Sequence, residues 1–154
     1  MLYQFALWAH SWLRWAVLLA GLVAWLRAIG GKTARRPWTP QDELWSLLLT
    51  ICVDLQFLVG VVLYAFLSPI VRQGLRNFGT AMQINVVRFF MIEHVIGMVA
   101  GIALVHIARV KIRKATDADR KHRLAMVLYG IALVLIIISI PWPGMPVSRP
   151  LFRP

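Results

Sequence analysis

The chain has 154 residues, including 17 Lys and Arg against 6 Asp and Glu, and its formal net charge is +11. Hydrophobic residues make up 60% of it and charged residues only 15%, whereas a water-soluble domain has about 25% charged residues. This composition excludes an ordinary soluble nucleic-acid-binding domain, and the single Cys52 excludes a disulfide framework and a thiolate metal cluster. We therefore expect an integral membrane protein.

Four apolar segments follow one another along the chain, at about residues 5–26, 44–67, 86–108 and 124–140. Each approaches the ~20 residues that a helix needs to cross a bilayer. The first segment does not resemble a cleavable signal peptide, because no Lys or Arg precedes it and no small-residue cleavage site follows it. The sequence predicts an all-α fold, a single four-helix transmembrane bundle over residues 1–154.

Polar residues and prolines mark the expected helix ends. Residues 39–43 (TPQDE) are typical of a helix start, with an N-cap, a proline in the first turn and two acids near the positive end of the dipole. Ser68-Pro69 is expected to end the second helix. Residues 116–119 (TDAD) resemble a capping box before the fourth helix, and residues 141–143 (PWP) are expected to stop it.

Basic residues are divided unevenly between the two sides of this bundle. The connections between helices one and two and between helices three and four contain 11 Lys and Arg, whereas the other side contains 5, including Arg149 and Arg153 in the tail. Because cytoplasmic loops carry the excess of positive charge, both termini are expected on the outer, periplasmic side of a bacterial inner membrane. Topology and attraction to anionic lipids explain the basic loops without a nucleic-acid partner.

A few ionisable and amide side chains interrupt the apolar segments, and such residues usually face the bundle interior and mark function. At ~1.5 Å per residue, His10 and His94 are expected at similar depths below the outer boundary, with Arg14 one turn from His10 on the same face. We expect Glu93 to pair with Arg14 in the interior, with Asp54 nearby. The full set is His10, Arg14, Asp54, Gln56, Glu93, His94 and His106.

Two histidines on facing helices at one depth are typical axial ligands of a haem b in a four-helix bundle, because the flat cofactor takes one ligand on each face. Gly21, Gly97 and Gly101 would open the cleft for the cofactor between the helices. The spacing Gly97-x-x-x-Gly101 is also typical of a simple helix-packing face.

Other interpretations of the histidines stay open. His10 and His94 would also fit hydrogen bonds to neighbouring helices, or a non-haem metal site completed by Asp54 and Glu93, although Arg14 would repel the cation. A second haem would use His106 and His122. The twelve-residue spacing from His94 favours instead an interfacial His106.

Several strings bear a resemblance that goes beyond hydropathy: HSWLRW at 10–15, GVVLY at 60–64, RFF and EH within 88–94, and IPWP at 140–143. Together they resemble a family of small bacterial four-helix membrane proteins labelled cytochrome b or cytochrome b561-like, over all four helices. The resemblance implies haem binding and carries over to His10, Arg14, Glu93 and His94. The chain departs from it at Asp54, where family members often have histidine.

The sequence therefore predicts a membrane haem b protein that exchanges electrons with quinone or an external acceptor, as a component of a quinone-linked oxidoreductase. Arg14 would bind a haem propionate, while Asp54 or Glu93 would move the proton that quinol oxidation releases. Two alternatives remain. One is a haem-free accessory or assembly subunit of a larger membrane complex; the other is a small proton-coupled transporter that needs a homo-oligomer to form its pathway.

Overall fold

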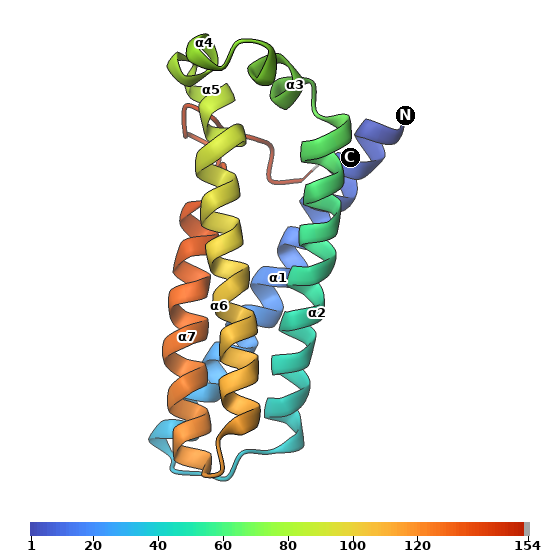
Figure 1. Ribbon diagram of the computed structural model, residues 1–154. Coiled ribbons are helices and arrows are strands. Elements are labelled where there is room, and N and C mark those ends of the chain that lie inside the picture. Colours follow the sequence, from blue (N-terminus) through green and yellow to red (C-terminus); the bar gives the residue numbers. More distant parts are fainter. Residues whose placement is uncertain (153–154) are drawn as a thin grey trace.

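The computed structural model describes residues 1–152, and all regular structure within them is helical (Figure 1). The long helices are α1 (Leu2–Thr33), α2 (Pro40–Val62), α6 (His94–Lys114) and α7 (Ala118–Ile138). A π-helical segment, η1 (Leu63–Leu67), extends α2. Short helices α3 (Pro69–Arg76), α4 (Phe78–Gln83) and α5 (Asn85–Arg88) then cap one end, and the π-helical η2 (Phe89–Glu93) joins α5 to α6.

Within residues 1–152, four helical rods are long and apolar enough to cross a membrane: Leu2–Thr33, Pro40–Leu67, Asn85–Lys114 and Ala118–Ile138. Three of the predicted segments lie wholly inside these rods. The fourth, 124–140, runs slightly past the end of α7, because the helix stops before Pro141. The prediction of an all-helical chain with four membrane-crossing helices is confirmed on length and composition.

The helix starts follow the predicted caps. Thr39 and Asp42 form a capping box at the start of α2, and Asp117 rather than Thr116 caps α7 by accepting from Arg120 N at 2.7 Å. Ser68 ends η1 as expected but also caps α3, where its hydroxyl accepts from Val71 N at 3.3 Å. Helices α3 to α5 were not predicted, because none has an apolar run long enough to signal it.

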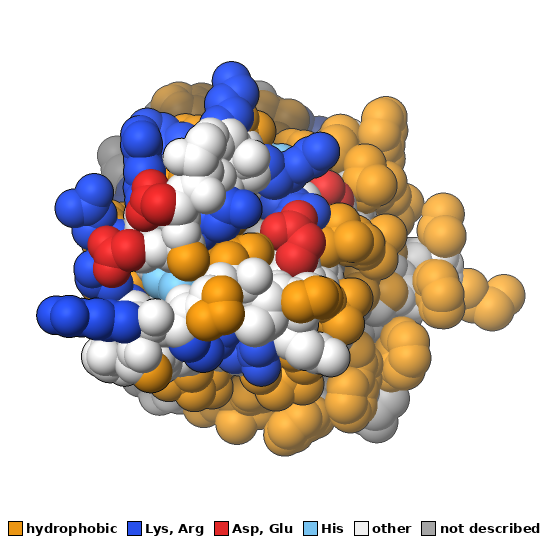
Figure 2. All heavy atoms as spheres, turned by 90° about the horizontal axis from the view of Figure 1, so that it is seen from below, with side chains coloured by type: hydrophobic (Ala, Val, Ile, Leu, Met, Phe, Trp, Pro, Cys, Tyr) orange, Lys and Arg blue, Asp and Glu red, His pale blue; other side chains and the backbone are white. Residues whose placement is uncertain are grey.

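The bundle is ordered α2, α1, α7, α6 around its perimeter, and the contact that closes the ring, between α2 and α6, is the least extensive. The start of α1 and the described part of the C-terminal tail lie at the end capped by α3 to α5 (Figure 1). Lys and Arg side chains gather at the opposite end, which carries the α1–α2 and α6–α7 connections (Figure 2). The expected segregation of charge is therefore present, although Arg153, counted on the other side, lies outside the described residues.

Asp42 organises this basic end. Its carboxylate is almost fully buried and accepts hydrogen bonds from Arg27 Nε at 3.0 Å and from Arg36 at 2.5 and 2.8 Å. Hydrogen bonding to this carboxylate raises the pKa of Arg36 above its usual value. Charge-assisted bonds of this kind are shorter and stronger than neutral ones, so Asp42 holds the ends of α1 and α2 and their connection together.

Two apolar clusters make up the interior. The larger joins all four long helices, and Ala20, Ala24 and Ala28 give α1 a small-residue face that allows close approach. The smaller cluster lies under the cap and consists of Val71, Ala81, Val87 and Met91. The candidate site lies between the two clusters.

Adjacent glycines in α1 offer a test of this packing. A Cβ on Gly31 would overlap the fully buried ring of His122, whereas a Cβ on Gly30 would meet nothing within 4 Å. We expect Gly31→Ala to destabilise the protein by about 1–3 kcal/mol, as overpacking does. Gly30→Ala should be neutral or stabilising by up to ~1 kcal/mol, because alanine favours helix. Thermal unfolding in detergent measures both, and equal stability of the two variants would contradict the observed packing.

Candidate functional site

A cavity of about 650 Å³ lies between the two apolar clusters, at the end of the bundle that carries the termini. Its volume is in the range of small-molecule and cofactor sites. Walls come from α1, α2 and α6, and α3, the end of α7 and the C-terminal tail complete it. The mainly apolar lining contains a few converging polar side chains, among them His10, Ser11, Arg14, Gln56, His94 and Arg149.

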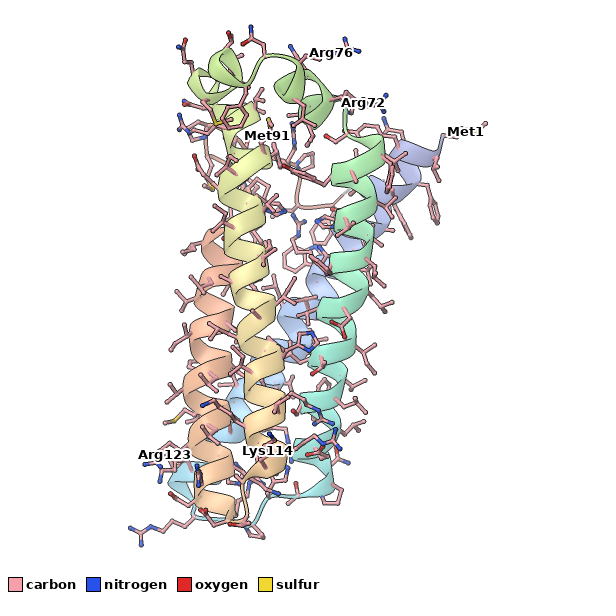
Figure 3. The ribbon with its side chains drawn as sticks, viewed as in Figure 1. Met1, Arg72, Arg76, Met91, Lys114 and Arg123 are labelled. Carbon is pink, nitrogen blue, oxygen red and sulfur yellow. The ribbon has the colours of Figure 1, made fainter. Side chains whose placement is uncertain are left out.

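His10 of α1 and His94 of α6 face each other at this cavity. Their ring centroids are 6.2 Å apart and the ring planes are inclined at 65°. The side-chain view in Figure 3 shows nitrogen-bearing side chains projecting into the space between these helices. The structure thus brings together the two residues whose depths match in the sequence, from helices far apart in the chain.

His94 is held in one orientation by α7. Its Nδ1 lies 2.8 Å from the carbonyl oxygen of Ser139, and since a carbonyl oxygen only accepts, Nδ1 carries the proton. Nε2 is then unprotonated and able to act as a ligand, which is the arrangement that metal-binding histidines usually have. Sequence reasoning missed Ser139, because it acts here through a backbone carbonyl that any residue would supply.

The π-helical segment η2 directly precedes His94, which is the first residue of α6. The rings of Phe89 and Phe90 lie 5.9 and 6.1 Å from the His94 ring, measured between centroids. Such single-turn π segments occur frequently at functional sites. Here η2 ends at Glu93, directly before His94, and two of its aromatic rings lie beside the His94 ring.

His10 is positioned by α2. A Cβ on Gly60 would lie 3.3 Å from Cε1 of the His10 ring, so glycine leaves the room that the ring needs. Gln56 Nε2 donates to the His10 carbonyl at 3.0 Å. Within residues 1–152, the buried atoms His10 Nδ1 and Gln56 Oε1 have no hydrogen-bond partner. Buried polar atoms are rarely left so, and these two indicate a site for a further molecule.

The C-terminal tail closes this end of the bundle. The Leu151 carbonyl accepts from Arg14 Nη2 at 2.5 Å and from Trp15 Nε1 at 3.2 Å, and Phe152 stacks on Trp15. Arg149, which the sequence suggested only for topology, lines the cavity with its guanidinium 4.8 Å from the Phe90 ring centre. Two cationic side chains, Arg14 and Arg149, therefore border the same cavity.

The expected ion pair between Glu93 and Arg14 was wrong. Glu93 binds Arg88 at 2.7 Å, five residues earlier on its own rod, and is half-exposed. Asp54 does not join the cluster either, because it binds His106 at 2.8 Å. The carboxylates proposed as proton carriers thus have partners away from the cavity. The expected contacts of Glu93 and Asp54 with the cluster were predicted from depth alone. The partner of each carboxylate depends instead on the helix face on which it lies.

The three glycines expected to open a cofactor cleft lie in helix contacts instead. An added Cβ would meet Leu133 at Gly21, Ser139 at Gly97 and Ile136 at Gly101. Gly21 brings α1 against α7, and the pair Gly97 and Gly101 brings α6 against α7. This is the packing role that the Gly97-x-x-x-Gly101 spacing also allowed.

His106 and His122, the proposed ligands of a second haem, have separate surroundings. His106 binds Asp54 on α2 and is about half-exposed. His122 is fully buried against Gly31 of α1, with its ring centre 5.0 Å from the ring centre of Trp38. They have no ring contact with each other among the described residues. The second site therefore remains a prediction from the sequence alone.

A non-haem metal site of His10, His94, Asp54 and Glu93 is not formed: within the part of the chain that the structure describes, no group of three or more His, Cys, Asp and Glu is placed to hold a metal ion. No family model, curated protein or solved structure matches this chain. The resemblance to cytochrome b proteins stays a prediction from the sequence. A proposed function therefore rests on the geometry of the cavity.

Proposed function

We propose that this protein is a membrane electron-transfer protein that binds one haem b in the cavity, with His10 and His94 as its axial ligands. The observation that carries the proposal is the pair of imidazoles from α1 and α6, 6.2 Å apart between ring centres, at a largely apolar cavity of about 650 Å³. Haem, when bound, supplies a one-electron redox centre whose potential depends on its ligands and surroundings.

The residues present suit such a group. Two imidazoles that bind one metal ion from opposite sides have ring centres about 6 Å apart, since each metal–nitrogen bond is ~2 Å long. The Ser139 carbonyl fixes the tautomer of His94 that leaves Nε2 as a ligand. The buried Nδ1 of His10 has no hydrogen-bond partner within residues 1–152. This is expected of a histidine ring that binds a cofactor.

Cations at the cavity suit the acidic edge of a haem. Arg14 and Arg149 both border it, and their guanidinium groups would bind the two propionates through charge-assisted hydrogen bonds. Tyr64 and the Phe90 ring contribute flat walls, and the Leu151 carbonyl of the tail accepts hydrogen bonds from Arg14 and Trp15.

The side of the membrane on which electrons would be exchanged depends on the topology of the chain. We infer that the basic end of the bundle faces the cytoplasm of a bacterial inner membrane and that both termini face outward. The cavity then lies in the outer half of the bilayer, where its electrons would pass to or from membrane quinone or an external acceptor. Lipids would surround the four rods, which are long and apolar enough to cross a membrane.

Absorption spectroscopy tests the proposal. The protein is purified in detergent from cells with adequate haem, and spectra are recorded as isolated and after dithionite. We expect a Soret band and sharp low-spin bands in the reduced spectrum, with one haem per chain by pyridine haemochrome. A folded, colourless protein would contradict the proposal, as would a haem that remains high-spin in both oxidation states.

A folded, colourless protein would favour the haem-free accessory subunit, whose assay is the loss of a larger complex when the chain is deleted. The geometry gives less support to a proton-coupled transporter. The three side chains expected to carry protons have different partners: Asp54 binds His106, Glu93 binds Arg88, and His94 binds the Ser139 carbonyl. These hydrogen bonds do not join the three side chains into one polar path.

A further inference from the structure

A second, smaller pocket of about 300 Å³ lies at the basic end of the bundle, between the end of α1 and the start of α7. Lys and Arg side chains gather at this end (Figure 2). The pocket shares no lining residue with the cavity beside His10 and His94. It is lined by Gly31, Arg35, Arg36, Pro37, Ala118 and Asp119.

The end of α1 forms one side of the pocket. Arg36 N donates to the Gly31 carbonyl at 3.1 Å, and Arg35 N donates to the Lys32 carbonyl at 3.4 Å, as in a Schellman motif. The side chain of Arg36 is bound to Asp42. The side chain of Arg35 is exposed and has no hydrogen bond or ion pair within residues 1–152. Arg35 is therefore available to a ligand in the pocket.

The start of α7 supplies hydrogen-bond donors on the other side. The first N–H groups of a helix have no partner within it and lie at the positive end of its dipole. Asp117 Oδ1 accepts from Arg120 N at 2.7 Å, and the Asp117 carbonyl accepts from Lys121 N at 3.2 Å. The N–H groups of Ala118 and Asp119, which both line the pocket, have no partner among the described residues. Such groups favour an anion.

The ring of His122 is directed at this pocket. Its side chain is fully buried, and neither ring nitrogen has a hydrogen-bond partner within residues 1–152. His122 follows Ala118 by four residues, so both lie on one face of α7, and a helical side chain leans toward the N-terminal end of its helix. The ring edge that bears both nitrogens faces Gly31, because Cε1, Nδ1 and Nε2 would lie 2.1, 2.4 and 2.5 Å from an added Gly31 Cβ. The nitrogens thus point toward two residues that line the pocket.

We propose that this pocket binds a phosphate group. A histidine ring carries at least one N–H in either protonation state, so His122 needs an acceptor that the chain does not supply. The Arg35 guanidinium and the free N–H groups of α7 are donors too. The carboxylate in the lining, Asp119, is paired with Lys32. A cationic set of donors fits an oxyanion.

The depth of the pocket suits phosphate among the oxyanions. Gly31 lies near the end of one membrane-crossing rod and Ala118 begins another, and lipid headgroups lie at the ends of such rods. The headgroup of an anionic phospholipid and inorganic phosphate offer the same acceptor oxygens. This inference does not depend on haem binding.

Two binding measurements on the purified full-length protein test the proposal and distinguish the two sources. Inorganic phosphate is titrated into detergent-solubilised protein that carries ¹⁵N-labelled histidine, and it should shift the ring-nitrogen resonances of His122 if the ligand comes from solution. Native mass spectrometry then compares phosphatidic acid with diacylglycerol of the same acyl chains. Retention of the first lipid alone, with the same His122 shift, identifies a lipid phosphate.

Variants assign the binding to this pocket. Arg35→Gln should weaken phosphate or phosphatidic acid binding about tenfold, because a charge-assisted hydrogen bond is lost. Arg113→Gln is the matched control, since Arg113 is an exposed cation near the end of α6, at the same end of the bundle and outside the pocket lining. It should bind as wild type does. His122→Phe keeps an aromatic ring without its N–H and should also bind about tenfold more weakly.

Three results would overturn the proposal. One is that neither ligand moves the His122 resonances, which would leave water as the partner of the ring. Another is an equal loss of binding in Arg35→Gln and Arg113→Gln, because net charge alone would then explain it. The third is wild-type binding by a folded His122→Phe protein. Should that variant fail to fold, the resonances of the unmodified protein and the comparison of Arg35→Gln with Arg113→Gln decide.

Discussion

Replacing either His10 or His94 with glycine is expected to abolish the low-spin haem spectrum of the purified protein. The two rings come from different helices and face each other across 6.2 Å, and neither has a second histidine of the cavity lining to replace it. A low-spin haem needs both axial ligands. We expect haem occupancy to fall at least about tenfold in each variant, since one of two strong ligand bonds is removed.

Chemical rescue separates ligand loss from misfolding. Imidazole added to His10→Gly or His94→Gly should restore the low-spin bands, because it can occupy the space of the missing ring. His106→Gln is the matched control, since His106 lies on the same rod as His94 but binds Asp54 instead; it should keep full haem content. Retention of the low-spin spectrum in both glycine variants would remove His10 and His94 as the ligands.

Much of the architecture could be predicted, because membrane-crossing helices are signalled by local properties. The lengths of the apolar segments predicted the four rods. The TPQDE string at 39–43 predicted the start of α2, where Thr39 and Asp42 form a capping box. The meeting of His10 and His94 also followed from the sequence, since depth in a membrane is proportional to position along a helix.

Partner choice could not be predicted in the same way. Glu93 lies at a depth similar to that of Arg14 but on another face of its helix. It therefore forms an ion pair with Arg88 instead. Asp54 likewise binds His106, on the outside of the bundle. Depth comes from one helix alone, whereas the rotation of each helix depends on packing with its neighbours, and that information is not local.

Backbone groups and the tail could not be predicted either. The Ser139 carbonyl that orients His94, and the Leu151 carbonyl that binds Arg14 and Trp15, have no residue-type signature. Gly97 shows how packing and site are joined. It was expected beside a cofactor but lies against Ser139, so it controls the distance between α6 and the carbonyl that holds His94.

Gly97→Ala is therefore expected to damage the haem site without touching the cavity. The added Cβ would lie 1.9 Å from the Ser139 Oγ and 3.0 Å from its Cβ. Since rotation of the hydroxyl relieves only the first contact, we expect α6 and α7 to separate slightly at the residue whose carbonyl binds His94 Nδ1. Overpacking of this kind costs about 1–3 kcal/mol. We expect a lower unfolding temperature in detergent and a haem affinity reduced by roughly tenfold, because removing a hydrogen bond to a ligating histidine typically weakens metal binding 10–100-fold.

A second substitution should reverse the effect. Ser139→Gly removes the Oγ and Cβ atoms that the new methyl group meets but keeps the carbonyl that His94 needs. The double variant Gly97→Ala, Ser139→Gly should therefore recover both haem affinity and unfolding temperature, apart from the loss of the Ser139 Oγ bond to the Leu135 carbonyl. Gly79→Ala, where an added Cβ meets nothing within 4 Å, is the matched control. Unchanged haem affinity in Gly97→Ala would mean that the packing of α6 against α7 does not set the orientation of His94.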